Sequence, residues 1–250
     1  MMRAAWAITG TTVRQLLGVR RAIIFGLAAL APAAVFLLLV QTVTDEAAVT
    51  HVLAMIAGLY FPLLVPIVAL IIASSALGDE RRDGTLSFLV LRPIPRSVIA
   101  LAKFAGAVIV AAGLNALGAI ALATVYGIQT GSWALVVPLV VGGAVASVVY
   151  ASLAVPLGFV THWSVLIGLV FVFIFENAVV SALRGLSSLS PWRIGLSAFS
   201  GMVPDDVASE LADIDIASLT GTGTALVRTV IIAAVSIGVI TLVLRRRDLT

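Results

Sequence analysis

One stretch of the chain, residues 78–97, concentrates charged side chains and prolines between two long apolar segments. Gly84 permits a sharp turn after the first charges, and the apolar residues beyond it can share one face of a short helix that the prolines end. A short amphipathic element with charges of both signs is suited to dock a soluble partner, although an ordinary solvated loop is the alternative interpretation. The residues concerned are Asp79, Glu80, Arg81, Gly84, Thr85, Leu86, Leu89, Pro93 and Arg96.

Three polar residues, Asn115, Glu176 and Asn177, interrupt apolar segments and are candidates for an intramembrane polar path. An ionisable group inside a membrane span costs at least ~2.5 kcal/mol, which makes Glu176 a functional candidate. Alternatively, Glu176 faces water or pairs with Arg184 or Arg228. Asn115 fits an interhelical hydrogen bond better than a binding role. An intramembrane protease would need two polar catalytic groups at one depth, and only Glu176 with Asn177 approaches that requirement.

The sequence lacks the residues that nucleotide, metal and hydrolase chemistry needs. Its single lysine, Lys103, does not follow a glycine-rich loop, so the chain has no phosphate cradle. If ATP drives this protein, ATP and Mg²⁺ bind to another polypeptide. There is no cysteine, and the two histidines, His51 and His162, fall on opposite sides of the expected membrane. We therefore expect no catalytic residue, cofactor or metal site in this chain.

The composition predicts a membrane protein built of helices. Of the 250 residues, 61% are hydrophobic and 11% are charged, whereas soluble domains are about half apolar and a quarter charged. Several apolar blocks exceed the ~20 residues that cross a bilayer, and they do not alternate as barrel strands do. The net charge of +3 comes from basic residues at the ends of these blocks. Because no basic patch carries interleaved aromatic residues, we expect lipid and no nucleic acid as a partner.

The predicted fold class is all-α, with residues 1–250 forming a single transmembrane domain. Residues 1–21 mix arginines with apolar side chains and suit an amphipathic helix lying in the membrane interface. Residues 184–224 form the longest polar segment outside the membrane. Six transmembrane helices are expected at about residues 22–43, 52–77, 98–127, 133–159, 163–183 and 225–244.

The distribution of charge predicts the orientation of these helices. Most of the 15 basic residues lie near the two chain ends and in residues 78–97, whereas acidic residues prevail in the other segments. Lys and Arg near span ends favour the cytoplasmic side. Basic residues at both ends require an even number of spans, which six satisfies. We therefore expect a multi-pass protein of the cell membrane (the plasma or inner membrane), with both termini cytoplasmic.

The pattern Glu80-x-x-x-Gly84-Thr85-Leu86, an apolar run, then Pro93-Ile94-x-Arg96 and Lys103, resembles the first cytoplasmic loop of ABC-2 type permeases. These proteins are the membrane subunits of type V ABC exporters, and the branch that includes copper-site maturation permeases is the most similar in character. The resemblance implies that this loop is a coupling helix seated on a separate ABC ATPase subunit. It also implies that residues 1–21 form the family's connecting helix and residues 184–224 its outer helices. The second proline beside Ile94 departs from the family pattern.

Two functions are compatible with this sequence pattern and with the resemblance. In the first, the chain is the permease of an ABC exporter, and two copies, or one copy and a homologue, pair with two ATPase subunits. In the second, a mechanical or assembly subunit passes ATPase motion to an extracytoplasmic protein without moving a solute. The second function would use a docking helix formed by Asp205, Asp206, Val207, Leu211 and Ile214. The sequence does not specify a substrate.

Overall fold

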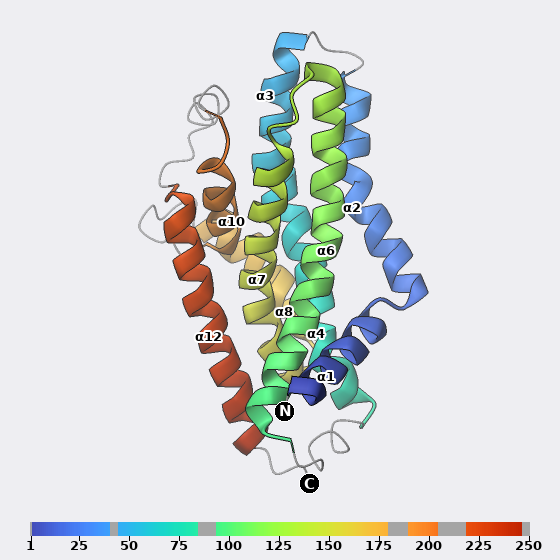
Figure 1. Ribbon diagram of the computed structural model, residues 1–250, viewed down its shortest axis with the longest axis vertical. Helices are drawn as coiled ribbons and strands as arrows, with labels where there is room; N and C mark the ends of the chain where they lie inside the picture. Colours follow the sequence, from blue (N-terminus) through green and yellow to red (C-terminus); the bar gives the residue numbers. More distant parts are fainter. Residues whose placement is uncertain (1, 41–44, 85–93, 180–189, 205–218, 247–250) are drawn as a thin grey trace.

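A computed structural model describes residues 2–40, 45–84, 94–179, 190–204 and 219–246 (Figure 1). Within these ranges the chain is helical and contains no strand, which confirms the predicted all-α class. Along the chain the helices are α1 (Met2–Leu16), α2 (Val19–Val40), α3 (Asp45–Met55), η1 (Ile56–Leu64), α4 (Val65–Arg82), α6 (Arg96–Thr130), α7 (Val136–Val160), α8 (Ser164–Val170), η2 (Phe171–Val179), α10 (Pro191–Ser200) and α12 (Thr222–Arg246), where η denotes a π-helix.

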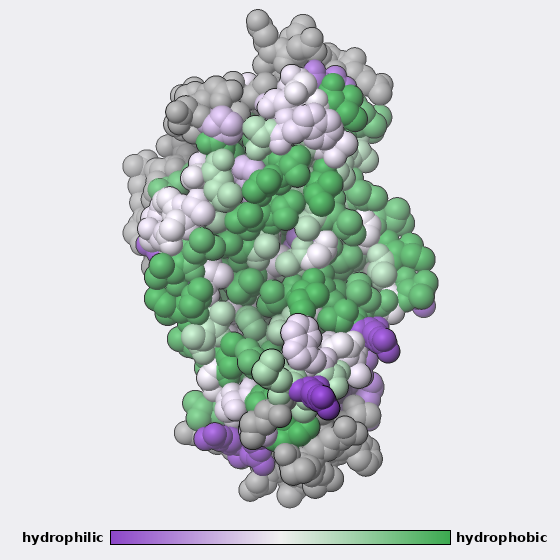
Figure 2. Space-filling view, viewed as in Figure 1, coloured by the Kyte–Doolittle hydropathy of each residue, from purple (hydrophilic) through white to green (hydrophobic). Residues whose placement is uncertain are grey.

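Four helical stretches in the described part of the chain are long and apolar enough to cross a membrane. They are Thr50–Arg82, Arg96–Thr130, Val136–Val160 and Thr222–Arg245. The spans expected at 22–43 and 163–183 correspond to shorter apolar helices, Ala22–Leu38 and Ser164–Glu176. On the face that Figure 2 shows, hydrophobic residues cover the middle, and hydrophilic residues gather towards the two ends. A band of this kind is typical of a surface that faces lipid.

The start of α1, the end of α4, the start of α6 and the end of α12 lie at one end of the bundle, the lower end in Figure 1. The turn between α6 and α7 lies at the opposite, upper end. Helix α6 is longer than the predicted span, and it ends where Gly131 adopts a φ of 72° and donates its N–H to the Gly127 carbonyl at 2.9 Å. Glycine accepts this left-handed conformation without the steric penalty of a side chain, so it can cap the helix.

Helix α7 is the central element, because α4, α6, α10 and α12 all pack against it. Glycines allow the closest of these contacts. A Cβ atom on Gly142 would lie 2.8 Å from the Phe61 ring and 2.9 Å from the Gly195 carbonyl oxygen. Near the lower end, a Cβ atom on Gly158 would lie 2.8 Å from the carbonyl carbon of Ser74 in α4. Without a strong hydrophobic drive between helices in lipid, such close backbone packing is what holds spans together.

The helix from Asp45 to Arg82 contains a π-helical section, η1, with Pro62 inside it. Proline has no N–H, and its ring collides with the carbonyl four residues earlier in a regular α-helix. The wider π turn relieves that collision while the helix continues. A second π section, η2, follows α8 and carries Glu176. Sections of this kind occur frequently at functional sites.

Candidate functional site

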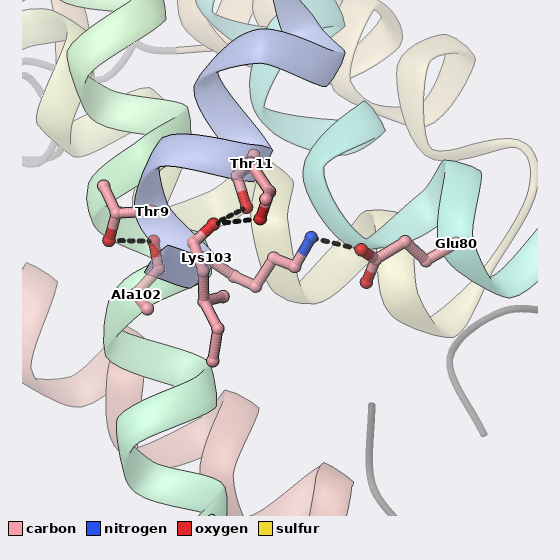
Figure 3. A network of polar contacts seen from close by, with 7 residues as sticks. Thr9, Thr11, Glu80, Ala102 and Lys103 are labelled. Carbon is pink, nitrogen blue, oxygen red and sulfur yellow. Dashed lines mark hydrogen bonds and ion pairs between the residues drawn. The ribbon is translucent and has the colours of Figure 1, made fainter. Parts of the chain in front are cut away.

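The lower end of the bundle contains a buried ion pair that joins two long helices (Figure 3). The ammonium group of Lys103, in the second turn of α6, contacts the carboxylate of Glu80 near the end of α4. The Lys103 side chain is 1% exposed and that of Glu80 is 14% exposed. Removing one partner from such a pair is costly, because it takes the opposite charge away from a buried group, so the pair specifies how the two helices lie relative to each other at this level.

Helix α1 is attached to the same place. The Thr9 hydroxyl donates a hydrogen bond to the Ala102 carbonyl oxygen of α6 at 3.2 Å, next to Lys103 (Figure 3). One turn further along α6, Gly106 leaves room for Thr12, because a Cβ atom on Gly106 would lie 2.8 Å from Thr12 Cβ. Helix α1 therefore packs along α6 with a glycine contact at its centre.

Arg81 connects α4 to the end of α7. Its Nη1 atom donates hydrogen bonds to the carbonyl oxygens of Phe159 at 2.9 Å and Val160 at 2.6 Å. The last carbonyls of a helix have no partner within the helix, and a guanidinium group satisfies them well. We name the set formed by Thr9, Glu80, Arg81 and Lys103 the lower junction, since it joins α1, α4, α6 and α7.

Five of the nine residues that were predicted to couple to an ATPase are described by the structure, and they lie at or beside the lower junction. Asp79 pairs with Arg82 on the surface of α4, while Glu80 pairs across to Lys103. The sequence did not indicate this pairing of Glu80 with Lys103, which lies 23 residues further along the chain. Gly84 follows the end of α4 with a φ of 67°, as a sharp turn requires. Arg96 is the first residue of α6. Four further predicted residues, Thr85, Leu86, Leu89 and Pro93, lie outside the described residues.

Glu176, the ionisable residue noted within an apolar segment, is 2% exposed and accepts hydrogen bonds from three donors. The Tyr150 hydroxyl of α7 donates at 2.6 Å, the Ser190 hydroxyl at 2.8 Å and the backbone N–H of Trp192 at 3.5 Å. Ser190 is the N-cap residue of α10 and Trp192 lies in its first turn, where the positive end of the helix dipole also favours a carboxyl oxygen. The Glu176 side chain thus fastens α10 to α7 and η2.

Asn115 lies in a second polar cluster, which is interhelical as the sequence suggested. Its amide nitrogen donates to Ser147 Oγ of α7 at 2.8 Å and to the Val65 carbonyl oxygen of α4 at 3.4 Å. The Tyr60 hydroxyl donates to the Asn115 carbonyl oxygen at 2.9 Å. Ser147 and Tyr150 are three residues apart on one face of α7, so this cluster and the Glu176 cluster are neighbours along that helix. Asn177 is in η2, but its side chain is outside the described part of the structure.

Most of the partners in these clusters have no signature in the sequence. Tyr150 and Ser147 lie within an unbroken apolar run, where a hydroxyl gives no sign of its neighbours. Ser190 did carry a signal, because serine followed by Pro191 is typical of a helix start. Within the described ranges no three His, Cys, Asp or Glu residues gather closely enough to hold a metal ion.

Residues 19–186 match the family model described as ABC-2 family transporter protein. The chain belongs to the ABC-2 transporter family. None of the curated proteins compared with the chain matches it. The match includes α2, the lower junction except for α1, and Glu176. As an ABC-2 family protein, the chain is a multi-pass membrane component of an ABC transporter, and the family implies association with an ABC ATPase subunit.

Proposed function

We propose that the chain is the permease subunit of an ABC exporter in the cell membrane, driven by separate ATPase subunits that bind at the lower end. The chain spans the membrane six times, with both termini cytoplasmic, and functions with a second copy or a homologue. Residues 79–96 form the coupling segment. ATP and Mg²⁺ are bound by the ATPase and not by this chain.

The lower junction is the observation that carries this proposal. A coupling segment is useful only if a push on it moves the transmembrane helices. Here Glu80 lies just before the segment's turn at Gly84, and Lys103 lies one to two turns after the segment ends at Arg96. Their ion pair holds together the two helix ends that flank the segment, and these ends form its base. When nucleotide binding draws the ATPases together, the loop and its two helices move as one unit.

Proximity to an ATPase is the first test. The sequence has no cysteine, so a single Asp83→Cys variant carries one thiol, on an exposed residue at the end of α4. Labelled with a benzophenone maleimide, this variant should cross-link to the ATPase that purifies with the chain. Ala134→Cys, exposed at the upper end, is the matched control and should not cross-link. A cross-link from Ala134→Cys alone would overturn the proposed side of docking.

Coupling is the second test. Glu80→Lys places a second ammonium group against Lys103, so the base of the loop opens and ATPase stimulation by the permease should be lost. The exchanged pair Glu80→Lys with Lys103→Glu restores opposite charges and should recover part of the stimulation. Chromatography in detergent identifies variants that retain the fold. A folded Glu80→Lys variant with unchanged transport and stimulated ATPase rates would contradict the assignment.

A mechanical or assembly role is the second candidate function, and the fastening of α10 favours it. Movement of α7 would pass through Tyr150 and Glu176 to Ser190 and from there to residues 184–224. In that case an extracytoplasmic protein receives the motion and no solute crosses. The predicted docking helix, with Asp205, Asp206, Val207, Leu211 and Ile214, lies outside the described residues. Deleting residues 205–219 should abolish activity in this case, and intact activity would eliminate the alternative.

A further inference from the structure

A cavity of about 400 Å³ opens at the lower end between α4, the end of α7 and the start of α8. We call it the Arg81 cavity. Its lining combines basic and hydroxyl groups from Arg81, Arg82, Thr161, His162 and Ser164 with the apolar side chains of Ile71 and Val165. It lies on the side of α4 that faces α7, and none of the residues of the Glu80–Lys103 pair lines it.

The charges and hydrogen-bond donors of the Arg81 cavity suit an anion. Among the described residues that line it there is no Asp or Glu. The bonds from Arg81 to Phe159 and Val160 use one terminal nitrogen and two neutral carbonyl oxygens, so other N–H groups of the guanidinium remain for a ligand. Arg82 also lines the cavity, although Asp79 partly offsets its charge.

The hydroxyl groups of Thr161 and Ser164 can also donate hydrogen bonds to a ligand in the cavity. The Thr161 oxygen accepts a hydrogen bond from the Trp163 N–H at 3.2 Å, which leaves the hydroxyl proton of Thr161 to donate elsewhere. Ser164 lies beside it in the lining. Two guanidinium groups with nearby hydroxyl donors are the combination that recognises a phosphate group, because arginine presents a planar fork to phosphate oxygens.

The surroundings of the cavity favour a phosphate group that belongs to a lipid. Trp163, next to His162, is 57% exposed, and tryptophan is enriched where hydrocarbon meets headgroups. Leu166 and Ile167 of α8 are 52% and 45% exposed, so apolar surface continues from the cavity along the helix. We propose that the Arg81 cavity binds the phosphate group of an anionic phospholipid, whose acyl chains lie along α8. Basic pockets between transmembrane helices bind anionic headgroups in other membrane proteins.

This proposal requires only that the bundle spans a membrane, and it does not depend on the coupling mechanism proposed above. It predicts a preference for anionic over zwitterionic lipid next to Trp163. The full-length chain is reconstituted in nanodiscs with Trp163 as the only tryptophan, after replacing Trp6, Trp133 and Trp192 by Phe. Quenching by brominated phosphatidylglycerol and by brominated phosphatidylcholine then gives their relative binding constants at this residue.

The expected preference for phosphatidylglycerol is about fivefold or more, since each arginine near the headgroups contributes roughly that factor. Arg82→Gln should reduce the preference by up to about fivefold, and the exposed Arg14→Gln of α1 is the matched control that should leave it unchanged. A second reporter, with Trp133 of the upper end as the only tryptophan, should show no comparable preference. Equal quenching by the two lipids at Trp163, or a preference that Arg82→Gln leaves intact, would overturn the proposal.

A soluble phosphate compound is the competing source of the same chemistry. Inorganic phosphate, added at constant ionic strength, separates the two. Retained quenching by brominated phosphatidylglycerol supports the lipid. Loss of the preference with phosphate, but not with chloride, would overturn the lipid assignment and identify a site for a soluble phosphate group.

Discussion

Lys103 is the only lysine of the chain, and it is among the most deeply buried of the described side chains. A buried ammonium group is stable only beside an opposite charge, which Glu80 supplies. A pair of this kind contributes little net stability compared with apolar residues of the same size, but losing one member is costly. Its presence therefore indicates that the position of two helices relative to each other is specified here.

Substituting Lys103 tests this interpretation. Lys103→Met takes the ammonium group away from the partly buried Glu80 carboxylate, so we expect destabilisation by about 3 kcal/mol. The double variant with Glu80→Gln also removes the carboxylate charge and should recover much of that loss. Thermal unfolding in detergent measures both. The exposed pair of Asp79 and Arg82 provides the control, since Asp79→Asn should change stability by less than about 1 kcal/mol. Equal effects for the two pairs would contradict the special role of Lys103.

The hydrogen bonds of Glu176 lead to a second prediction. Glu176→Leu leaves the Tyr150 hydroxyl, the Ser190 hydroxyl and the Trp192 N–H without their acceptor, each buried donor costing about 1–3 kcal/mol. Tyr150→Phe removes only one of the three bonds and should have a clearly smaller effect. Thermal unfolding of the two variants, with limited proteolysis near residue 200, measures how firmly α10 is held. A larger loss in Tyr150→Phe than in Glu176→Leu would show that the carboxyl group is not the centre of the cluster.

For individual residues, the sequence indicated which polar side chains are unusual in an apolar segment, but it did not indicate their hydrogen-bond partners. Glu176 and Asn115 stood out because polar groups in an apolar run are expensive. The hydroxyls of Tyr150 and Ser147 that satisfy them come from another helix, and their register against Glu176 depends on how the helices pack. Hydropathy in a single sequence contains no information about that register. For the same reason the pairing of Glu80 with Lys103 could not be told from pairing with the adjacent arginines.

At the scale of elements, the crossing of α4 and α7 is set by a glycine. A Cβ atom on Gly158 would lie within 3 Å of backbone atoms of Ser74, and backbone cannot move aside as a flexible side chain can. We expect Gly158→Ala to lower the melting temperature and the yield of folded protein. Gly113→Ala in α6 is the matched control, because nothing lies within 4 Å of its added Cβ atom.

The control substitution should be neutral or stabilising, since alanine is favoured over glycine inside a helix by about 1 kcal/mol. A Gly158→Ala variant as stable as Gly113→Ala would show that α4 and α7 do not approach so closely in the membrane.

The helices themselves were largely predictable, and the irregular sections within them were not. Blocks of apolar residues gave the approximate positions of the long helices, because only a helix satisfies its own backbone in lipid. Their ends were less certain: α6 begins at Arg96 and continues to Thr130, beyond the hydrophobic block. The two π-helical sections, η1 and η2, were not predicted from the sequence. Pro62 indicated an irregularity in η1, but η2 contains no proline and has the composition of an ordinary apolar helix.

At the scale of the whole molecule, the orientation in the membrane is the property that the charge distribution predicts. Ser97→Cys at the lower end and Ala134→Cys at the upper end each introduce one exposed thiol into a chain without cysteine. In intact cells, a membrane-impermeant maleimide should label Ala134→Cys, and it should label Ser97→Cys only after permeabilisation. Labelling of both variants in intact cells, or of Ser97→Cys alone, would contradict cytoplasmic termini and the docking of an ATPase at the lower end.

Because α1 packs against α6, we expect α1 to move with α6 and not with α2, its neighbour in the sequence. Helix α1 packs on α6 through Thr9 and Gly106, and much less on α2, which follows it in sequence. The break between them is at Gly18, which belongs to neither helix. We therefore expect Met2–Leu16 to follow any tilt of α6, with the chain bending at the connection to α2 that contains Gly18. Gly18→Pro would stiffen that connection and oppose such a tilt, although Gly18 lies far along the chain from the segment where the force is applied.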